Sequence, residues 1–377
     1  MKLALIFTND WELYGDGSGD YFEVQHQPLI DLTSLMNDYG AKLSIMAEIF
    51  QQVKHEELSS TNPDFKKIAE AWKDILRESF TKGHDVQLHI HPQWNEANLE
   101  NNEWVLGDNW SIGKRSKEQI EAFIQMGKSY LESTLQEVDS NYKCEVYRAG
   151  AYYIEPSTNV IDTLVKNGFI CDTSVTKGTY VDNYYDYRKA FSNILPWGIG
   201  SEGVTKKVEN SSLIEIPINS AISLDSEAFK KFFPDLYYKL KFGVSLTESE
   251  KSWMKERDKV KSVRYPVSRR AYKKHENKNI SWYVNKIFSV NAIQLDYDYV
   301  PSSVFVKILK NILSDKQITK YKNKNIIIPV VASGHVKDMH NTDNVKRILE
   351  GIKNELSDKV EYWTISEAAK YAKENLI

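Results

Sequence analysis

The chain has 377 residues, of which 41% are hydrophobic and 27% charged, and its formal net charge is -3. This length and apolar content suffice for one large α/β domain or for two smaller domains with their own cores. The near-neutral charge gives no reason to expect a nucleic acid as a partner, because that requires a strongly basic domain. The two cysteines, Cys144 and Cys171, lie in apolar, strand-like runs, so we expect reduced core thiols in a cytoplasmic compartment and no disulfide framework.

Short apolar runs that alternate with helical patterns predict a mostly parallel sheet covered by helices. The predicted strands are residues 3–8, 42–47, 85–90, 144–148, 169–172, 213–218, 326–332 and 360–364. Helices are predicted over 116–137, where Ser116 and Gln119 form a capping box, over 157–167, over 302–315 and from about 341 onward. The pattern fits a (β/α) barrel or an open doubly wound sheet, and we favour the barrel. Reacting groups of such a barrel lie at the C-terminal ends of its strands.

The first residues predict where the protein works. The apolar run 1–7 is too short to span a bilayer, and it leads directly into the polar sequence TNDWE where a signal peptide would have its cleavage site. We therefore expect a cytoplasmic protein, with peripheral association at the inner membrane face as an option.

Asp10 and Glu12 end the first predicted strand. Side chains two apart on a strand point the same way, so both carboxylates can enter one site while Trp11 turns away. Two carboxylates there can serve as a metal ligand and a base. The alternative is a helix N-cap or a solvated loop acid.

His89 and His91 end the third predicted strand with the same spacing. Both imidazoles can bind one ion, and imidazole with carboxylate oxygen is a typical zinc ligand set. The alternative is two unrelated histidines, one packed and one exposed. His84 has the opposite parity and is expected to be a bystander.

Two more polar groups end strands. Arg148 closes the strand before Gly150 and is suited to orienting a carboxylate, unless it forms only a surface salt bridge. His335 follows the apolar strand 326–332 and is suited to proton transfer near neutral pH.

The order of TNDWE, GHDVQLHIHP, YRAGAYYIEPSTNVIDTLVKNGFICDTSV and SGHVKD resembles the NodB-type polysaccharide deacetylases, carbohydrate esterase family four, over about residues 1–220 and 288–377. The resemblance implies a distorted barrel of the (β/α)7 type, a divalent metal and hydrolysis of an N-acetyl group. It also implies that Asp10 is the catalytic base, that His89 and His91 bind the metal, that Arg148 orients the base and that His335 is the general acid.

The chain departs from the family pattern at two places. The family has two adjacent acids on its first strand, whereas Trp11 takes the second place here, so Glu12 is inferred as the metal ligand from strand parity. If Asp10 is the ligand instead, the base is unassigned. The two histidines are also closer in sequence than the family's common spacing, so whether both bind the metal stays open.

The predicted function is removal of the acetyl group from an N-acetylated sugar in a polysaccharide or in its nucleotide- or lipid-linked precursor, with zinc as the expected ion. Backbone N–H groups near Tyr152 are expected to hold the oxyanion. Alternatives are another metal-dependent amidohydrolase or phosphoesterase, or a non-catalytic glycan-binding protein on the same fold. The side chains expected to contact the substrate are Trp11, Trp94, Tyr152, Asp172 and Lys337.

Two segments carry further predictions. The glycine-rich loop 15–20 lacks the Lys-Ser/Thr of a phosphate-binding loop and is predicted to be mobile at the site mouth, or a plain connector. Residues 221–287 are predicted to be an insertion between the barrel parts 1–220 and 288–377. Within residues 230–286, 16 Lys and Arg against 6 Asp and Glu give a net charge of about +10. We expect this segment to bind an anionic membrane surface or a pyrophosphate-linked substrate, or else to be a solvated face.

Overall fold

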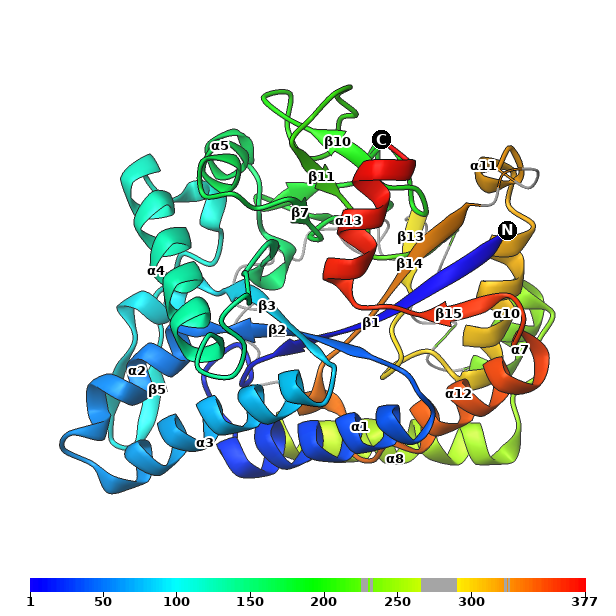
Figure 1. Ribbon diagram of the computed structural model, residues 1–377. Coiled ribbons are helices and arrows are strands. Elements are labelled where there is room, and N and C mark those ends of the chain that lie inside the picture. The colour runs from blue at the N-terminus through cyan, green and yellow to red at the C-terminus, as the bar shows by residue number, and fades with distance from the viewer. Residues whose placement is uncertain (225–229, 231–232, 266–289, 322–323, 325) are drawn as a thin grey trace.

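The computed structural model describes the whole chain except residues 225–229, 231–232, 266–289, 322–323 and 325. Its centre is a nine-stranded sheet that curls around an interior (Figure 1). Seven strands follow one another in parallel, from β14 through β1, β2, β3, β6 and β7 to β11. Their bounds are β1 (Lys2–Trp11), β2 (Leu43–Glu48), β3 (Asp85–Ile90), β6 (Val146–Ala149), β7 (Cys171–Asp172), β11 (Leu213–Glu215) and β14 (Ile327–Gly334).

Two short strands complete the sheet. β15 (Val360–Tyr362) pairs in parallel with the first half of β1, and β2 pairs with the second half of the same strand. β10 (Trp197–Ile199) runs antiparallel to β11. A parallel bridge joins Ile218, just after β11, to Val331 of β14. The curled sheet therefore returns toward its first edge, and the predicted barrel-like α/β fold is confirmed at this level.

Alternation along β1 separates an inner from an outer core. Ala4 and Ile6 belong to an inner cluster, whereas Leu5, Phe7 and Trp11 pack outward in the main core between sheet and helices. A β-strand alternates its side chains between two faces, so the same parity carries Asp10 and Glu12 to the inside.

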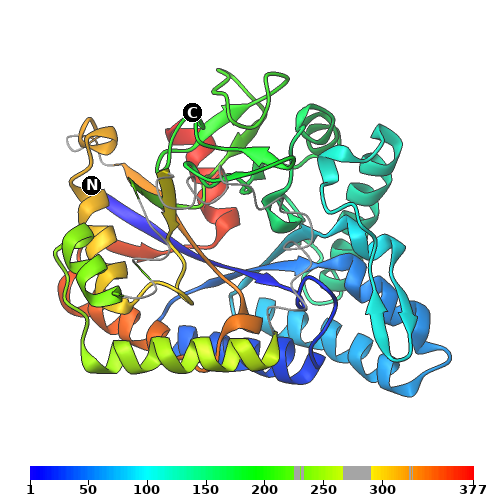
Figure 2. The ribbon, with the colours of Figure 1, turned by 180° about the vertical axis from the view of Figure 1, so that it is seen from behind.

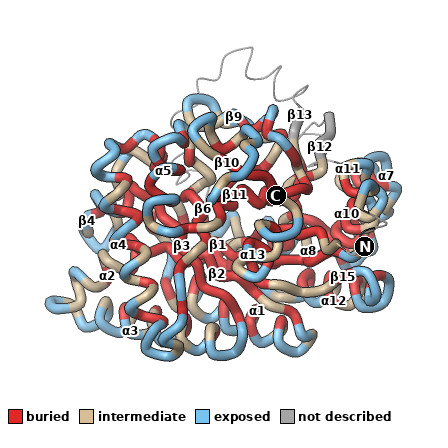
Figure 3. The backbone as a smooth tube through the Cα atoms, turned by 45° about the horizontal axis from the view of Figure 1, so that its top comes forward, coloured by how far each residue is buried: buried red, intermediate tan, exposed pale blue. Residues whose placement is uncertain are grey.

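The helices cover the outside of the sheet, and Figure 3 shows buried strands beneath helices whose outer sides are exposed. They are α1 (Gln27–Asp38), α2 (Ile49–Ser59), α3 (Pro63–Thr81), α4 (Lys117–Leu135), α5 (Thr158–Lys166), α10 (Ser302–Leu313) and α12 (Asp343–Glu355). The capping box of Ser116 and Gln119 that was predicted for α4 is present. The last helix, α13 (Ile365–Asn375), packs Ile365 and three alanines against the inner cluster.

The expected insertion contains regular elements in its described part, which the sequence pattern did not predict. β12 (Ser220–Leu224) and β13 (Val290–Gln294) form an antiparallel pair on either side of it. Between them lie α7 (Pro234–Phe242) and the long helix α8 (Glu248–Arg264), which runs along the lower edge of the molecule in Figure 2. Both cysteines are buried and free, as expected. In the described part of the chain, no helix combines the length and apolarity needed to cross a membrane.

Candidate metal and catalytic site

Polar side chains from the strands β1, β3 and β6 meet at the C-terminal end of the sheet. β1 brings Asp10 and Glu12, β3 brings His89 and then His91, and Arg148 lies beside His89 on β6. All five are buried, with 5% or less of each residue exposed. Because parallel strands end at the same edge, strands whose site residues lie 59 to 138 positions apart in sequence contribute to one site.

Glu12, His89 and His91 form a cluster whose ligand atoms lie within 4.8 Å of one another, the only such metal-competent group found among the described residues. The Glu12 Oε2 atom lies 2.5 Å from Nε2 of His91 and 3.8 Å from Nε2 of His89. The Nε2 atom of His89 is buried and has no hydrogen-bond partner, whereas that of His91 faces the Glu12 carboxylate. A buried unpaired nitrogen is costly, and a shared cation would satisfy it together with His91 and the carboxylate. The donor set therefore fits a zinc ion.

The outer nitrogen of each imidazole has a partner that orients the ring. Nδ1 of His89 lies 3.0 Å from the backbone oxygen of Arg148, and Nδ1 of His91 lies 2.9 Å from the side-chain amide of Gln93. The Gln93 Oε1 atom is buried without a partner. Exchanging the two ends of this amide would let Nδ1–H of His91 donate to oxygen and would free Nε2 as a ligand. Such partners of metal-binding histidines are typical of real sites.

Gly150 explains part of the motif that follows Arg148. A Cβ atom on this glycine would lie 2.6 Å from Cγ of His91 and 2.6 Å from the backbone oxygen of Ile90. The next two residues, Ala151 and Tyr152, have φ values of 51° and 65°. The small residue is thus required for close packing against a candidate ligand, and the backbone beyond it is strained, as is common at functional sites.

Asp10 forms a buried ion pair with Arg148, whose Nη1 donates to Oδ1 at 2.5 Å and also to the Thr8 hydroxyl at 2.9 Å. Burial alone would raise the pKa of Asp10, but the charges of Arg148, His89 and His335 outweigh it and the pKa is lowered. The carboxylate is therefore held ionised and oriented. The base role of Asp10 and the orienting role of Arg148 stay predictions.

His335 faces the two carboxylates from the end of β14. Its Nε2 lies 3.5 Å from Oδ2 of Asp10 and 3.9 Å from Oε1 of Glu12, and its side chain is 20% exposed. Burial lowers its pKa, partly opposed by the charge of Asp10. The imidazole is thus near both carboxylates and accessible from outside.

Lys337 enters the same cluster from beyond β14. Its ammonium group donates to Oε1 of Glu12 at 2.5 Å and to the backbone oxygen of Leu13 at 3.1 Å. Burial would raise the pKa of Glu12, but His91 and Lys337 hold it well below its usual value. Lys337 therefore contacts a candidate metal ligand directly, which leaves its predicted role in substrate binding untested.

Four other residues were expected to contact the substrate. Trp11 is fully buried, donates its indole N–H to the backbone oxygen of Gln25 and packs on Trp72, so it lies in the outer core, away from the site. Trp94 is 2% exposed and packs against Trp104. The placement of these two tryptophans offers no surface to a substrate.

Asp172 and Tyr152 have different surroundings. Asp172 is fully buried, accepts a hydrogen bond from Ser174 and is paired in register with Glu215; burial raises the pKa of both carboxyl groups. Asp172 is thus an internal group of the barrel. Tyr152 is half-buried and its hydroxyl accepts a hydrogen bond from Gln294. Of these four residues, only Tyr152 is partly open to solvent.

Glu48 was not predicted and lies next to the cluster. It caps α2 through the N–H groups of Phe50 and Gln51, and it also accepts the backbone N–H of His91 at 3.1 Å. Burial raises its pKa to about 7. A strand ending at residue 48 instead of 47 would have placed this acid among the polar groups at strand ends.

The glycine-rich loop 15–20 packs on two tryptophans. A Cβ atom on Gly15 would lie 2.6 Å from the ring of Trp110, and one on Gly17 would lie 2.6 Å from Cβ of Trp104. The ring centroid of Trp110 is 6.3 Å from that of His91, so the loop does lie beside the cluster. Residues 266–289, which carry part of the predicted basic surface, lie outside the described residues.

No protein-family model matches the chain, and a search of curated proteins gives no significant match. A structure from Mycobacterium smegmatis assigned as a polysaccharide deacetylase aligns over 100% of this chain and 92% of its own, with a TM-score of 0.47 and 12% identity. A GH57 branching enzyme from Thermococcus kodakaraensis covers 100% and 72%, with a TM-score of 0.45 and 12% identity. The allantoinase PuuE covers 99% and 91%, with a TM-score of 0.43 and 10% identity. These structures have different activities, so we infer function from the site.

Proposed function

We propose that this protein is a zinc-dependent deacetylase of the NodB type that hydrolyses the N-acetyl group of a sugar. The observation that carries the proposal is the convergence of two buried imidazoles on Glu12, one of them with an unpaired nitrogen, beside an oriented Asp10 and a partly exposed His335. Amide hydrolysis needs a Lewis acid, a base and an acid for the leaving amine. The site offers one candidate for each role.

Glu12, His89 and His91 would hold the ion, which when bound would polarise the acetyl carbonyl and acidify an attacking water. Asp10, kept ionised by Arg148, would take the proton of that water. His335, once protonated, would give a proton to the departing amine, which is too basic to leave as an anion. Backbone N–H groups near Tyr152 are our candidates for the oxyanion.

Metal content is the first test of this proposal. Purified protein should contain about one equivalent of zinc or a similar ion, measured by elemental analysis, and a His89→Ala, His91→Ala double variant should lose it. His84→Gln is the matched control, because His84 is buried outside the cluster. Undiminished metal in the double variant would remove the basis of the site.

Turnover is the second test. Asp10→Asn and His335→Ala should each reduce acetate release from the best N-acetylated sugar by about 10²-fold or more, with metal content retained by His335→Ala. Asp31→Asn, on the exposed side of α1, controls for the loss of a carboxylate. Near wild-type release by either site variant would refute the role assigned to that residue.

A second candidate function, a non-catalytic glycan-binding protein, is favoured by one contact. The Lys337 ammonium group already neutralises Glu12, as a metal ion would. Under this alternative the protein contains no zinc and binds N-acetylated sugars without releasing acetate. The same metal and acetate measurements decide between the two functions.

We further propose that the substrate is a precursor in the assembly of a surface polysaccharide, with the protein in the cytoplasm or at the inner membrane face. Acetate release from UDP-linked, lipid-linked and free N-acetylated sugars would test this. A preference for free or polymeric sugars would contradict it.

The anionic partner expected for the basic segment is a separate proposal. Co-sedimentation with anionic and neutral liposomes at low and high salt tests it, because exposed charges are screened beyond about 10 Å at 0.1 M salt. Equal binding to both kinds of liposome would refute it.

A further inference from the structure

Lys261 of helix α8 is the centre of a half-buried ionic cluster beside the His335 turn. Its ammonium group donates to Oδ2 of Asp338 at 2.8 Å, and the Tyr299 hydroxyl donates to the same oxygen at 2.7 Å. Lys261 also contacts the hydroxyl of Tyr299 and lies 4.6 Å from the centre of its ring. The side chains of Lys261 and Asp338 are 20% and 10% exposed. Loss of one partner would leave the other charge poorly compensated.

Asp338 ends the short helix η7 (Val336–Asp338), which directly follows His335 and contains Lys337. The turn is therefore held at its far end by α8. At its near end, the backbone N–H of His335 donates to Oδ2 of Asp298 at 2.5 Å. The two side chains that reach Asp10 and Glu12 from this turn thus depend on contacts made outside the sheet.

Two arginines of α8 extend the same contact face. Arg257 donates to the backbone oxygens of Asp298 (3.3 Å) and Tyr299 (3.1 Å), and Arg264 donates to the backbone oxygen of Met339 (3.0 Å). Residues 257, 261 and 264 are spaced by four and three, so they share one side of the helix. The three basic side chains on this side of α8 therefore bind the two loops around His335 and do not point toward an external partner.

The helix itself is fixed at both ends. Near its start, Glu250 accepts hydrogen bonds from the Ser302 hydroxyl and the Ser303 N–H at the beginning of α10. Just after its end, the ring of Tyr265 stacks on that of Tyr14 at 4.6 Å, and the Tyr14 hydroxyl donates to the backbone oxygen of Lys337. Because α8 is anchored in this way, its contacts can fix the position of the 335–338 turn.

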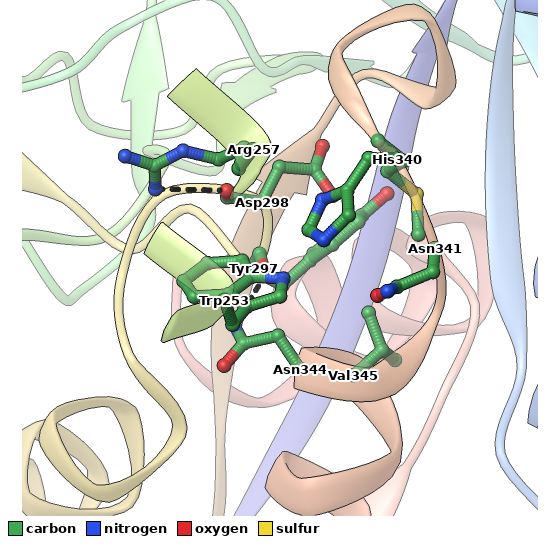
Figure 4. Close-up of a pocket in the computed structure, with 9 residues that line it drawn as sticks. Trp253, Arg257, Tyr297, Asp298, His340, Asn341, Asn344 and Val345 are labelled. Carbon is green, nitrogen blue, oxygen red and sulfur yellow. Dashed lines mark hydrogen bonds between the residues drawn. The ribbon is translucent and has the colours of Figure 1, made fainter. Parts of the chain in front are cut away.

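A small pocket behind Asp298 is lined by Trp253 and Arg257 of α8 on one side and by His340 and Asn344 on the other (Figure 4). The Oδ1 atoms of Asp298 and Asn344 are buried without a partner. The side-chain amide of Asn344 donates to the backbone oxygens of Tyr297 and Val300, so this loop is held from α12 as well as from α8.

We propose that α8 is a positioning element for the proposed general acid, and that Lys261 is its principal positioning residue. The proposal rests on the proposed function, because it takes His335 as the acid. It extends that function by assigning the basic insertion a role in catalysis. In this role α8 holds the 335–338 turn so that His335 can reach the leaving amine. The metal cluster is carried by β1 and β3, and Lys337 links it to the 335–338 turn.

The test compares Lys261→Met with Lys259→Met, which removes an exposed lysine two residues away on the same helix. Lys261→Met should lower kcat for acetate release by about 10- to 100-fold, as expected for misplacement of a catalytic group by about 1 Å, with KM and zinc content changed less than about twofold. Lys261→Arg should restore part of kcat, because it keeps the charge. Lys259→Met should match the wild type.

Hydrogen exchange by mass spectrometry supplies a readout that needs no turnover. Backbone amides of residues 335–339 should exchange faster in Lys261→Met than in the wild type or in Lys259→Met. Unchanged exchange of these amides in Lys261→Met would overturn the proposal. It would also be overturned if kcat fell together with zinc content while KM rose by a similar factor, because that result indicates general unfolding. If the wild-type protein releases no acetate, the proposed function fails, and the exchange experiment still decides whether α8 holds the turn.

Discussion

Replacing Arg148 by methionine should cost the metal-free protein about 3–5 kcal/mol of unfolding free energy at pH 7, the usual result of stranding one member of a buried ion pair. Arg148 is fully buried and Asp10 is 2% exposed, so solvent would screen little of the remaining charge. The change also removes hydrogen bonds from the guanidinium group to Thr8 and Thr173. Equilibrium unfolding in urea, with chelator present, measures the loss.

The double variant Arg148→Met, Asp10→Asn separates the stranded charge from the lost packing. Asparagine is neutral, so the double variant should be more stable than the sum of the two single losses predicts, by a coupling energy of about 1–3 kcal/mol. A loss below about 1 kcal/mol in Arg148→Met would refute the reasoning. So would a double variant no more stable than the sum of the two single changes predicts.

The same pair predicts opposite responses to acid. In the wild type the pKa of Asp10 is lowered, so its contribution is present above the unfolded value near 3.8 and is lost as pH falls through the folded pKa. In Arg148→Met, burial is no longer opposed by Arg148 and should raise that pKa above 3.8. The variant should then gain stability relative to wild type as pH falls from 7 toward 4. Parallel pH profiles for the two proteins would contradict this.

Two further predictions concern the site wall and a distant histidine. Gly150→Ala should weaken zinc binding by about tenfold or more without removing a ligand, because the new Cβ atom would clash with His91. Gly200→Ala is the control and should leave zinc affinity unchanged, because its Cβ atom would have no neighbour closer than 3.6 Å. Equal zinc affinities of the two variants in competitive chelator titrations would refute this prediction. His84 accepts the Leu43 N–H, and burial lowers its pKa to about 4. In the unfolded chain this imidazole binds a proton more readily than in the folded protein, so up to about 3 kcal/mol of unfolding free energy should be lost as pH falls from 6.5 to 4. His84→Gln should make the unfolding free energy less dependent on pH in this range. Equal slopes would contradict the prediction.

The sequence predicted the strand ends well because local periodicity determines which way their side chains point. Asp10, Glu12, His89 and His91 could be placed on one side of two strands by counting residues, and parallel strands bring such ends together. The same rule says that Trp11 faces outward, as the structure shows. Trp11 is fully buried there, so its position gives no support to the predicted contact with a substrate.

Features that depend on contacts between distant loops could not be predicted from periodicity. Nothing local indicates that Asp298 accepts the His335 N–H, or that Lys261 meets Asp338, since these pairs are 37 and 77 residues apart. The α8 pattern was also obscured, because its inward face is basic and amphipathicity normally marks the inward face with apolar residues. From the sequence alone, a charged face that packs inward has the same pattern as a charged face exposed to solvent.

Glu12 shows how local periodicity and distant contacts act together. It lies two residues beyond Asp10, just past the end of β1, and therefore on the same inner side. At that depth Glu12 reaches His91 from one oxygen and Lys337 from the other. An acid at position 11 would point into the outer core, where Trp11 now packs on Trp72. The inner position of Glu12 therefore provides a carboxylate at the cluster and a direct contact with Lys337 of the 335–338 turn.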